Sequence, residues 1–193
     1  DIPLPALIGF YAPLYPRFNI ERFKTYIHSF AIPEDSTLQN MSYGQKKKVL
    51  ISFALATNAR VLLMDEPTNG LDIISKSQFR KVLAEAMDDE RCILISTHQV
   101  KDLENLIDHI TVIDEGKVLF DEHTETIAKK LSFRFAHRDE DLSGAIYSES
   151  SLAGSVVVLP NKSGEESKLD LELLYKAIVT NKAEITKIFQ SQF

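Results

Sequence analysis

The chain has 193 residues, of which 44% are hydrophobic and 26% charged, a balance typical of one globular domain with room for a small second one. Its net charge of −6 argues against a nucleic-acid-binding surface. No apolar run approaches the roughly 20 residues of a transmembrane helix, and the first residues lack the pattern of a signal peptide.

The N-terminal region is expected to contain one clear helix. Prolines interrupt residues 1–6, so we expect neither a helix nor a central strand there. Asn19 can cap a helix over residues 20–30, which carries apolar side chains on one face. Several aromatic residues lie between these two segments, among them Tyr11, Tyr15 and Phe18.

A second helix is predicted directly after Ser42. Ser42 is a favourable N-cap residue, and Gln45 follows at the spacing of a capping box. The free N–H groups and the positive end of the helix dipole would face outward there, which suits an anion. The alternative is an ordinary capped helix on which the lysines of residues 46–48 form a solvated face.

Residues 61–66 read Val-Leu-Leu-Met-Asp-Glu, an apolar run that leads directly into two carboxylates. This pattern predicts a fully buried strand of a parallel sheet. Ligands bind beyond the carboxyl ends of such strands, and neighbouring side chains point in different directions. One of Asp65 and Glu66 can therefore hold a metal while the other acts on a water. The alternative is a strand that happens to end in two surface acids.

A second apolar strand, residues 92–97, leads into His98, with a helix predicted over residues 75–87 before it. A strand, a helix and a second strand place both strand ends at the same edge of a parallel sheet. A lone histidine is more often structural than catalytic, but this one would lie near Glu66. Cys92, the single cysteine, is expected to be a small buried hydrophobic residue.

The remaining residues predict an alternation of short elements. A helix over residues 100–108 should lead into a β-hairpin that turns at residues 114–117. A short helix, capped by Thr124, follows. Further strands and helices then predict a small α+β extension: strands at 132–136, 145–148 and 155–159, and helices at 169–179 and after Asn181. The histidines at 109, 123 and 137 show no ligand spacing with one another.

Taken in this order, the motifs resemble those of the ATP-binding subunit of an ABC transporter. Residues 41–45, Met-Ser-Tyr-Gly-Gln, resemble the signature motif of the family, and residues 61–66 resemble the Walker B strand with its catalytic glutamate. Residues 69–72, Asn-Gly-Leu-Asp, resemble the D-loop, and His98 resembles the switch histidine.

The resemblance implies an α/β fold, the C-terminal part of a P-loop NTPase sheet with its helices, together with a helical subdomain and the α+β extension. Residues 1–39 would belong to the helical subdomain, residues 40–131 to the ATPase core and residues 132–193 to the extension. The aromatic residues of the first segment would either pack within the subdomain or contact a membrane-spanning partner, and both readings remain open.

The resemblance also implies site roles for ATP and Mg²⁺. ATP would lie between the phosphate loop of one subunit and the signature helix of another, as part of an ATP-hydrolysing machine. Glu66 would orient and polarise the attacking water, and His98 would contact the γ-phosphate. Asp65 would hold Mg²⁺, and Asp72 would link the two ATP sites. The signature residues would bind nucleotide: Ser42, Tyr43, Gly44 and Gln45. Tyr43 replaces the first glycine of the family motif, which would bring a ring close to the phosphate.

The implied partners are a transmembrane permease subunit and a second ATPase subunit, with a homodimer expected, and no nucleic acid. The implied location is the cytoplasm, peripheral on the inner face of the cell membrane, where ATP-dependent closure of the dimer would drive transport. Two alternatives stay open. The chain could be a non-hydrolysing interaction module, or an ABC ATPase that serves a machine other than a transporter.

One motif of the family is missing from these residues. Among the glycines only Gly116 precedes a lysine, and Val118 follows, so the sequence contains no phosphate loop of the form Gly-x-x-x-x-Gly-Lys-Ser/Thr (Walker A). The Q-loop glutamine is missing as well. We therefore expect the chain alone to be inactive as an ATPase. Residues absent from this sequence, a partial chain, or a natural protein without the loop would each explain this.

Overall fold

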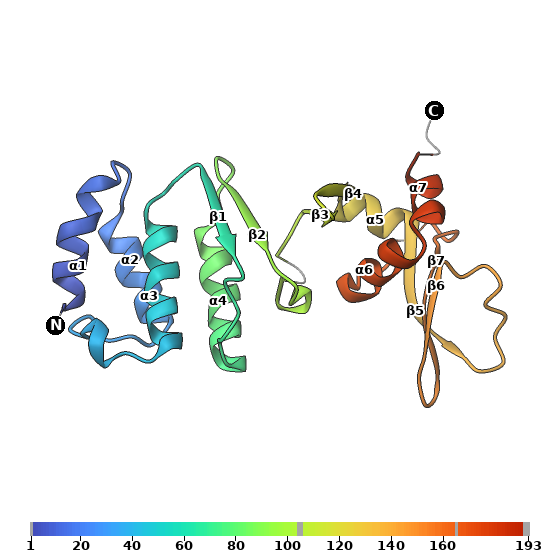
Figure 1. Ribbon diagram of the computed structural model, residues 1–193, viewed down its shortest axis with the longest axis horizontal. Helices are drawn as coiled ribbons and strands as arrows, with labels where there is room; N and C mark the ends of the chain where they lie inside the picture. Colours follow the sequence, from blue (N-terminus) through green and yellow to red (C-terminus); the bar gives the residue numbers. More distant parts are fainter. Residues whose placement is uncertain (1, 104–105, 165, 191–193) are drawn as a thin grey trace. The chain divides into compact units, whose positions relative to one another are not determined.

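The computed structural model describes residues 2–103, 106–164 and 166–190 (Figure 1). The chain divides after Asp102 into two compact units, each with its own packing. Within the described residues, no helix has both the length and the apolar character needed to cross a membrane. The division of the sequence into segments 1–39, 40–131 and 132–193 remains a prediction.

The first unit starts with a helix in the proline-containing segment where none was predicted. Helix α1 spans Leu4–Tyr11 and buries Leu4 and Ile8. The expectation that prolines exclude a helix here is wrong, because Pro3 is the N-cap and Pro5 occupies the second helical position. The first N–H groups of a helix have no acceptor within it, so proline is tolerated there.

Helices α2 (Ile20–Ser29) and α3 (Tyr43–Ala56) lie next to each other (Figure 1). Aromatic side chains fill the contact between them. The predicted cap of α2 is confirmed, since the Asn19 side chain accepts a hydrogen bond from the backbone N–H of Arg22. The ring of Phe53 on α3 lies 4.9 Å from that of Phe18 and 6.5 Å from that of Phe23, measured between centroids. These contacts fix the position of α3, whose first turn carries the signature residues.

Strands β1 (Val61–Asp65) and β2 (Cys92–Ser96) pair in parallel, joined by helix α4 (Ile73–Ala86). The predicted order of strand, helix and strand is therefore confirmed. The register pairs Asp65 with Ser96, so both strands end at one edge of this sheet. The chain beyond Asp65 and the chain beyond Ser96 consequently lie side by side.

The expectation that β1 is fully buried is wrong. Val61, Leu63 and Leu94 are 62%, 72% and 56% exposed, whereas Met64 is only 9% exposed. Side chains alternate between the faces of a strand, so one face of the β1–β2 pair is left open by the described residues of this unit. Cys92 pairs with Val61 and is exposed as well, so the prediction of a buried cysteine is also wrong.

The helix expected over residues 100–108 forms only as a single 3₁₀ turn, Val100–Leu103. Positions 104 and 105 of that prediction lie outside the described residues, and residues 106–108 are not helical. The physical reason is the hairpin that follows, because its first strand pairs from His109 onward and requires an extended chain.

The second unit contains the predicted hairpin of β3 (His109–Asp114) and β4 (Lys117–His123). Its turn residues Glu115 and Gly116 have φ values of 47° and 74°, as tight two-residue hairpin turns require. Pairing also sets His109 opposite His123, with ring centroids 4.5 Å apart. Among the residues that the structure describes, no group of three or more His, Cys, Asp or Glu side chains is arranged to hold a metal ion.

Helix α5 (Thr124–Lys130) then leads into the α+β extension. The prediction that Thr124 caps this helix is wrong, because Thr124 is the first helical residue and His123 is the N-cap. The Thr124 hydroxyl instead donates to the carbonyl of Asp108 at 3.2 Å. The extension has three antiparallel strands in the order β5-β7-β6 and two helices: β5 (Leu131–His137), β6 (Tyr147–Ser150), β7 (Gly154–Pro160), α6 (Leu171–Thr180) and α7 (Lys182–Gln190). Its core is formed by side chains such as Leu131, Val158 and Leu174, each at most 1% exposed.

A buried arginine joins the helices of the first unit. Arg91 is 8% exposed, and its guanidinium donates to the carbonyls of Leu55, Ala59 and Ala86 at 3.1, 3.3 and 2.9 Å. These carbonyls lie near the ends of α3 and α4 and just before β1. Burial lowers the pKa of the Arg91 guanidinium.

We predict that Arg91→Met lowers the free energy of unfolding by about 3 kcal/mol, because it leaves buried carbonyls without a donor. Urea denaturation measures this change. Arg60→Met is the control, since Arg60 is exposed and its removal should change stability by less than about 0.5 kcal/mol. Equal losses in the two variants would contradict the role assigned to Arg91.

Candidate functional site

The candidate site begins at the first turn of α3, where the predicted capping box is present. The hydroxyl of Ser42 accepts from the backbone N–H of Gln45 at 3.3 Å, and the Gln45 side chain accepts from the backbone N–H of Ser42 at 2.9 Å. The next two N–H groups, of Tyr43 and Gly44, donate to no other residue in the described part of the chain. They lie at the positive end of the helix dipole and can receive an anion.

Two of the three lysines after this turn are engaged in contacts, so they do not form a plain solvated face. The Lys47 ammonium donates to the carbonyl oxygens of Glu66 and Asn69 at 2.6 and 2.7 Å. Lys48 donates to the Gln78 side chain at 3.1 Å. Burial lowers the pKa of Lys47, and the nearby negative charges of Glu66 and Asp65 partly oppose this effect.

Asp65 and Glu66 lie at the carboxyl end of β1, beside the end of β2. The Asp65 carboxylate accepts a hydrogen bond from the hydroxyl of Ser96, its partner in the strand register. The backbone N–H of Glu66 donates to the carbonyl of Ser96 at 2.9 Å. Glu66 has a φ of 44°, in the left-handed region, so the chain turns sharply at this residue.

The Glu66 carboxylate is held by donors from the chain that follows β2. Its Oε1 contacts Nδ1 of the His98 ring at 2.6 Å and accepts the backbone N–H of His98 at 2.9 Å. Its Oε2 accepts the hydroxyl of Thr97 at 2.9 Å. Burial alone would raise the pKa of Glu66, but these hydrogen bonds from His98 and Thr97 outweigh it, so the pKa lies below its usual value. The carboxylate is therefore ionised at neutral pH.

Residues 67–72 connect β1 to α4 through two successive turns. The N–H of Asn69 donates to the carbonyl of Glu66 at 3.2 Å, and the N–H of Leu71 donates to the carbonyl of Thr68 at 3.1 Å. Asp72 is the N-cap of α4, and its carboxylate accepts the N–H of Ser75 at 2.7 Å. This hydrogen bond lowers the pKa of Asp72.

The ring of Tyr43 lies over the same turn. A Cβ placed on Gly70 would lie 3.0 Å from Cε1 of Tyr43, so this glycine leaves the space that the ring occupies. Gly70 also has a φ of 78°, which favours glycine. The start of α3 and the D-loop segment are consequently in direct contact.

Asp65 has the chemistry of a Mg²⁺ ligand. Mg²⁺ is usually held by one or two carboxylates together with phosphate oxygens of the substrate, so a single carboxylate at a strand end fits that use. The Asp65 carboxylate is hydrogen-bonded to Ser96, and such an outer partner orients a ligating oxygen. The Glu66 carboxylate is instead turned toward His98.

The structure thus places the predicted residues Asp65, Glu66 and His98 at one sheet edge and the signature residues at the start of α3. Lys47 connects the two sets, although in the sequence it is only the middle residue of a run of three lysines. Ser96 and Thr97 were also missed as partners of the acids. Their signal was present in the sequence, since two hydroxyl residues end the apolar strand that precedes His98.

Comparison with known proteins finds similarity to ABC transporters and their ATP-binding proteins. The family model for ABC transporters matches residues 19–69. A putative ABC transporter ATP-binding protein of Mycoplasma pneumoniae is 40% identical over 58% of this chain and 32% of its own length. The bacitracin transport ATP-binding protein of Bacillus licheniformis is 29% identical over 78% of this chain and 51% of its own length.

A solved structure of the ATP-binding subunit of an ABC transporter has a TM-score of 0.55 at 21% identity, over 66% of this chain and 55% of that one. This likeness, together with the mixed helices and sheets, confirms the predicted α/β fold class. The chain spans about a third to a half of the length of the two curated relatives above.

We predict that Gly70→Ala lowers the free energy of unfolding by about 1–2 kcal/mol, because alanine at this φ is strained and its methyl group meets the Tyr43 ring. The matched control is Gly9→Ala in α1, where an added Cβ has no heavy atom within 4 Å. That change should raise stability by about 0.5–1 kcal/mol, since alanine favours helix. Urea denaturation distinguishes the two, and equal signs would contradict the prediction.

Proposed function

We propose that this chain, a homologue of the ATP-binding proteins of ABC transporters, carries the signature and hydrolysis groups of an ATPase subunit that drives transport. The observation that carries the proposal is the meeting of Glu66 with His98 at the strand edge that also holds Asp65. A non-hydrolysing interaction module would have no need for a fixed, ionised glutamate at this place, so the geometry favours hydrolysis.

Glu66 acts on the attacking water in this proposal. An ionised carboxylate accepts a hydrogen bond from water, orients it and can take up its proton. Thr97 and the backbone of His98 fix the direction of the carboxylate. The His98 ring is 71% exposed on its side chain, so it can leave Glu66 and contact the γ-phosphate. Asp65 would hold Mg²⁺, which neutralises charge on the phosphate oxygens when it is bound.

The first turn of α3 receives the γ-phosphate of an ATP molecule that is held mainly by a second subunit. The free N–H groups of Tyr43 and Gly44 and the dipole of the helix supply the attraction. A second copy of the same protein is the simplest partner, and in such a dimer Asp72 would link the two ATP sites.

These residues supply one part of the complete ATP site. The sequence contains no Gly-x-x-x-x-Gly-Lys motif, whose backbone and lysine would cradle the phosphates. We therefore propose that the 193 residues do not hydrolyse ATP by themselves, and that the activity belongs to a protein in which this chain is joined to a phosphate loop.

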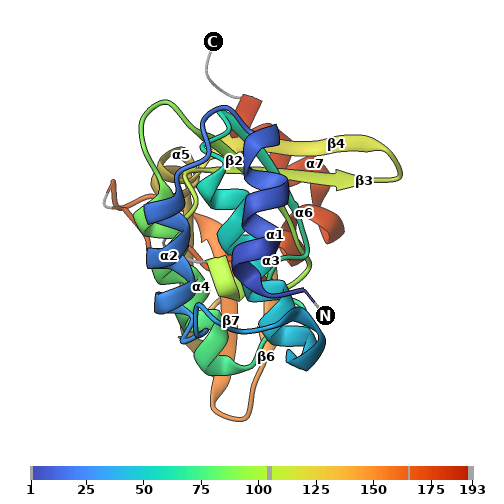
Figure 2. The same cartoon turned by 90° about the vertical axis from the view of Figure 1, so that its left-hand side faces the viewer.

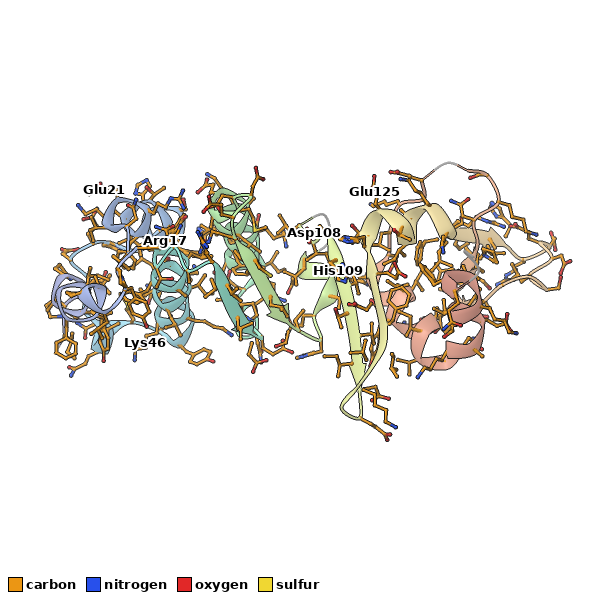
Figure 3. All side chains as sticks on the ribbon, turned by 90° about the horizontal axis from the view of Figure 1, so that it is seen from above. Arg17, Glu21, Lys46, Asp108, His109 and Glu125 are labelled. Carbon is orange, nitrogen blue, oxygen red and sulfur yellow. The ribbon has the colours of Figure 1, made fainter. Side chains whose placement is uncertain are left out.

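A groove between α1 and α3 supports the proposal of a membrane partner. In Figure 2 α1 is seen in front of α3, and side chains of both helices line the groove. The groove has a volume of about 590 Å³ and is lined mainly by apolar and aromatic side chains, among them Leu7, Tyr11, Tyr15, Leu50 and Phe53. Lys46 of α3, labelled in Figure 3, is also one of the lining residues. Tyr15 also packs edge-on against Phe53, so the aromatic residues both form the subdomain and line its surface.

We propose that this groove receives a segment of a transmembrane permease subunit. The protein would then be peripheral on the cytoplasmic face of the membrane. Leu50 is 66% exposed in the groove, an apolar side chain that such a segment could cover.

We predict that Glu66→Gln in the complete protein traps an ATP-bound dimer and reduces ATP turnover by at least about 100-fold, because the amide cannot take up a proton from water. Steady-state hydrolysis and size-exclusion chromatography with Mg-ATP measure the two effects. Glu34→Gln is the control, since Glu34 is exposed and is not one of the residues of the candidate site. Unchanged turnover in Glu66→Gln would reject the catalytic assignment.

The groove is tested with Leu50→Lys in cells that produce the whole transporter. We predict that the variant loses most of its membrane association, since it places a charge in the apolar groove. Flotation of cell membranes followed by detection of the protein measures the bound fraction. Leu152→Lys is the matched control, because Leu152 is 95% exposed in the other unit. If both variants float with the membranes as the unchanged protein does, the groove is not the contact.

A further inference from the structure

We infer that Lys47 is a positioning residue that joins the signature turn of one ATP site to the catalytic glutamate of the other. The inference rests on the proposed function and extends it to a residue outside the expected motifs. The geometry that points to it is the pair of hydrogen bonds from one ammonium group to the carbonyls of Glu66 and Asn69, at 2.6 and 2.7 Å.

These bonds fix the peptide group that follows the catalytic carboxylate. On its amino side, the backbone N–H of Glu66 donates a hydrogen bond to the carbonyl of Ser96 at 2.9 Å. On its carboxyl side, the carbonyl accepts both Lys47 and the N–H of Asn69. The left-handed φ of 44° at Glu66 costs of order 1 kcal/mol in a residue with a side chain, so contacts of this kind are needed to hold it.

Lys47 acts on this turn together with Tyr43. The two residues are four positions apart on α3, so their side chains leave the same face of the helix. Tyr43 covers Gly70, and Lys47 binds the carbonyls at both ends of residues 66–69. The first turn of α3 and the turn after β1 are therefore held as one body.

This connection has a consequence for a dimer with two ATP sites. In the proposed dimer, the N–H groups at the start of α3 face an ATP molecule held by the partner, while Glu66 serves the ATP molecule of its own subunit. When the phosphate of the partner's ATP displaces the start of α3, Lys47 transmits this movement to the backbone of Glu66. Misplacing a catalytic group by about 1 Å can reduce a rate by up to about 100-fold, so this link bears on turnover.

The experiment compares Lys47→Met with Lys47→Arg in the complete protein. Methionine keeps the length and apolar character of the side chain but cannot donate, whereas arginine restores donors with a positive charge. Lys81→Met is the control, because Lys81 lies on α4 with its side chain 71% exposed, paired only loosely with Glu85 at 3.9 Å.

The first readout is amide hydrogen exchange of Asn69 and Leu71, followed by NMR without nucleotide. We expect exchange at these amides to be about tenfold faster in Lys47→Met, and close to that of the unchanged protein in Lys47→Arg and Lys81→Met. Equal exchange in all four proteins would overturn the inference. This readout does not depend on ATP hydrolysis, so it decides the role of Lys47 even if the proposed function fails.

The second readout is the kinetics of ATP hydrolysis. We expect kcat to fall about tenfold in Lys47→Met while KM for ATP stays within about twofold, with most of the loss recovered in Lys47→Arg. A fall in KM and kcat alike in every lysine variant would overturn the positioning role. If Lys47→Met does not fold, Lys47→Gln replaces it, since the shorter amide cannot reach both carbonyls. Absence of hydrolysis in the unchanged protein would instead reject the proposed function.

Discussion

The parallel pairing of β1 with β2 is the constraint on which the candidate site depends. Because Asp65 is paired with Ser96, the next residues of both strands lie at the same sheet edge. The Glu66 carboxylate can then accept hydrogen bonds from three donors of Thr97 and His98, the two residues that follow β2. A shift of this register by one residue would reverse the faces of β2 and separate the glutamate from the histidine.

Local chemistry made much of this arrangement predictable from the sequence. The capping box of Ser42 and Gln45 needs only residues three apart, and the strand, helix and strand of residues 61–97 follow from apolar runs and one amphipathic stretch. The meeting of Glu66 and His98 followed from the rule that parallel strands end at one edge. The resemblance to ABC transporter subunits supplied the roles, which the residues alone left open.

Other features could not be predicted because they depend on distant parts of the chain. The exposure of Leu63 and Leu94 is set by what covers the sheet, which an apolar run does not reveal. Lys47 was read as part of a charged face because its partners are backbone carbonyls, which have no signature in the sequence. Helix α1 was missed because a proline excludes a helix from its interior but not from its first turn.

The left-handed backbone conformation of Glu66 is unfavourable for the stability of the fold, while the proposed function requires a carboxylate at this position. Glycine would adopt this conformation without strain, but it has no carboxylate. Laboratory selection for thermal stability alone should therefore replace Glu66 with other residues, whereas selection for ATP hydrolysis should retain glutamate. Under the proposed function, Glu66 supplies a carboxylate at a backbone position where glycine would be the less strained residue.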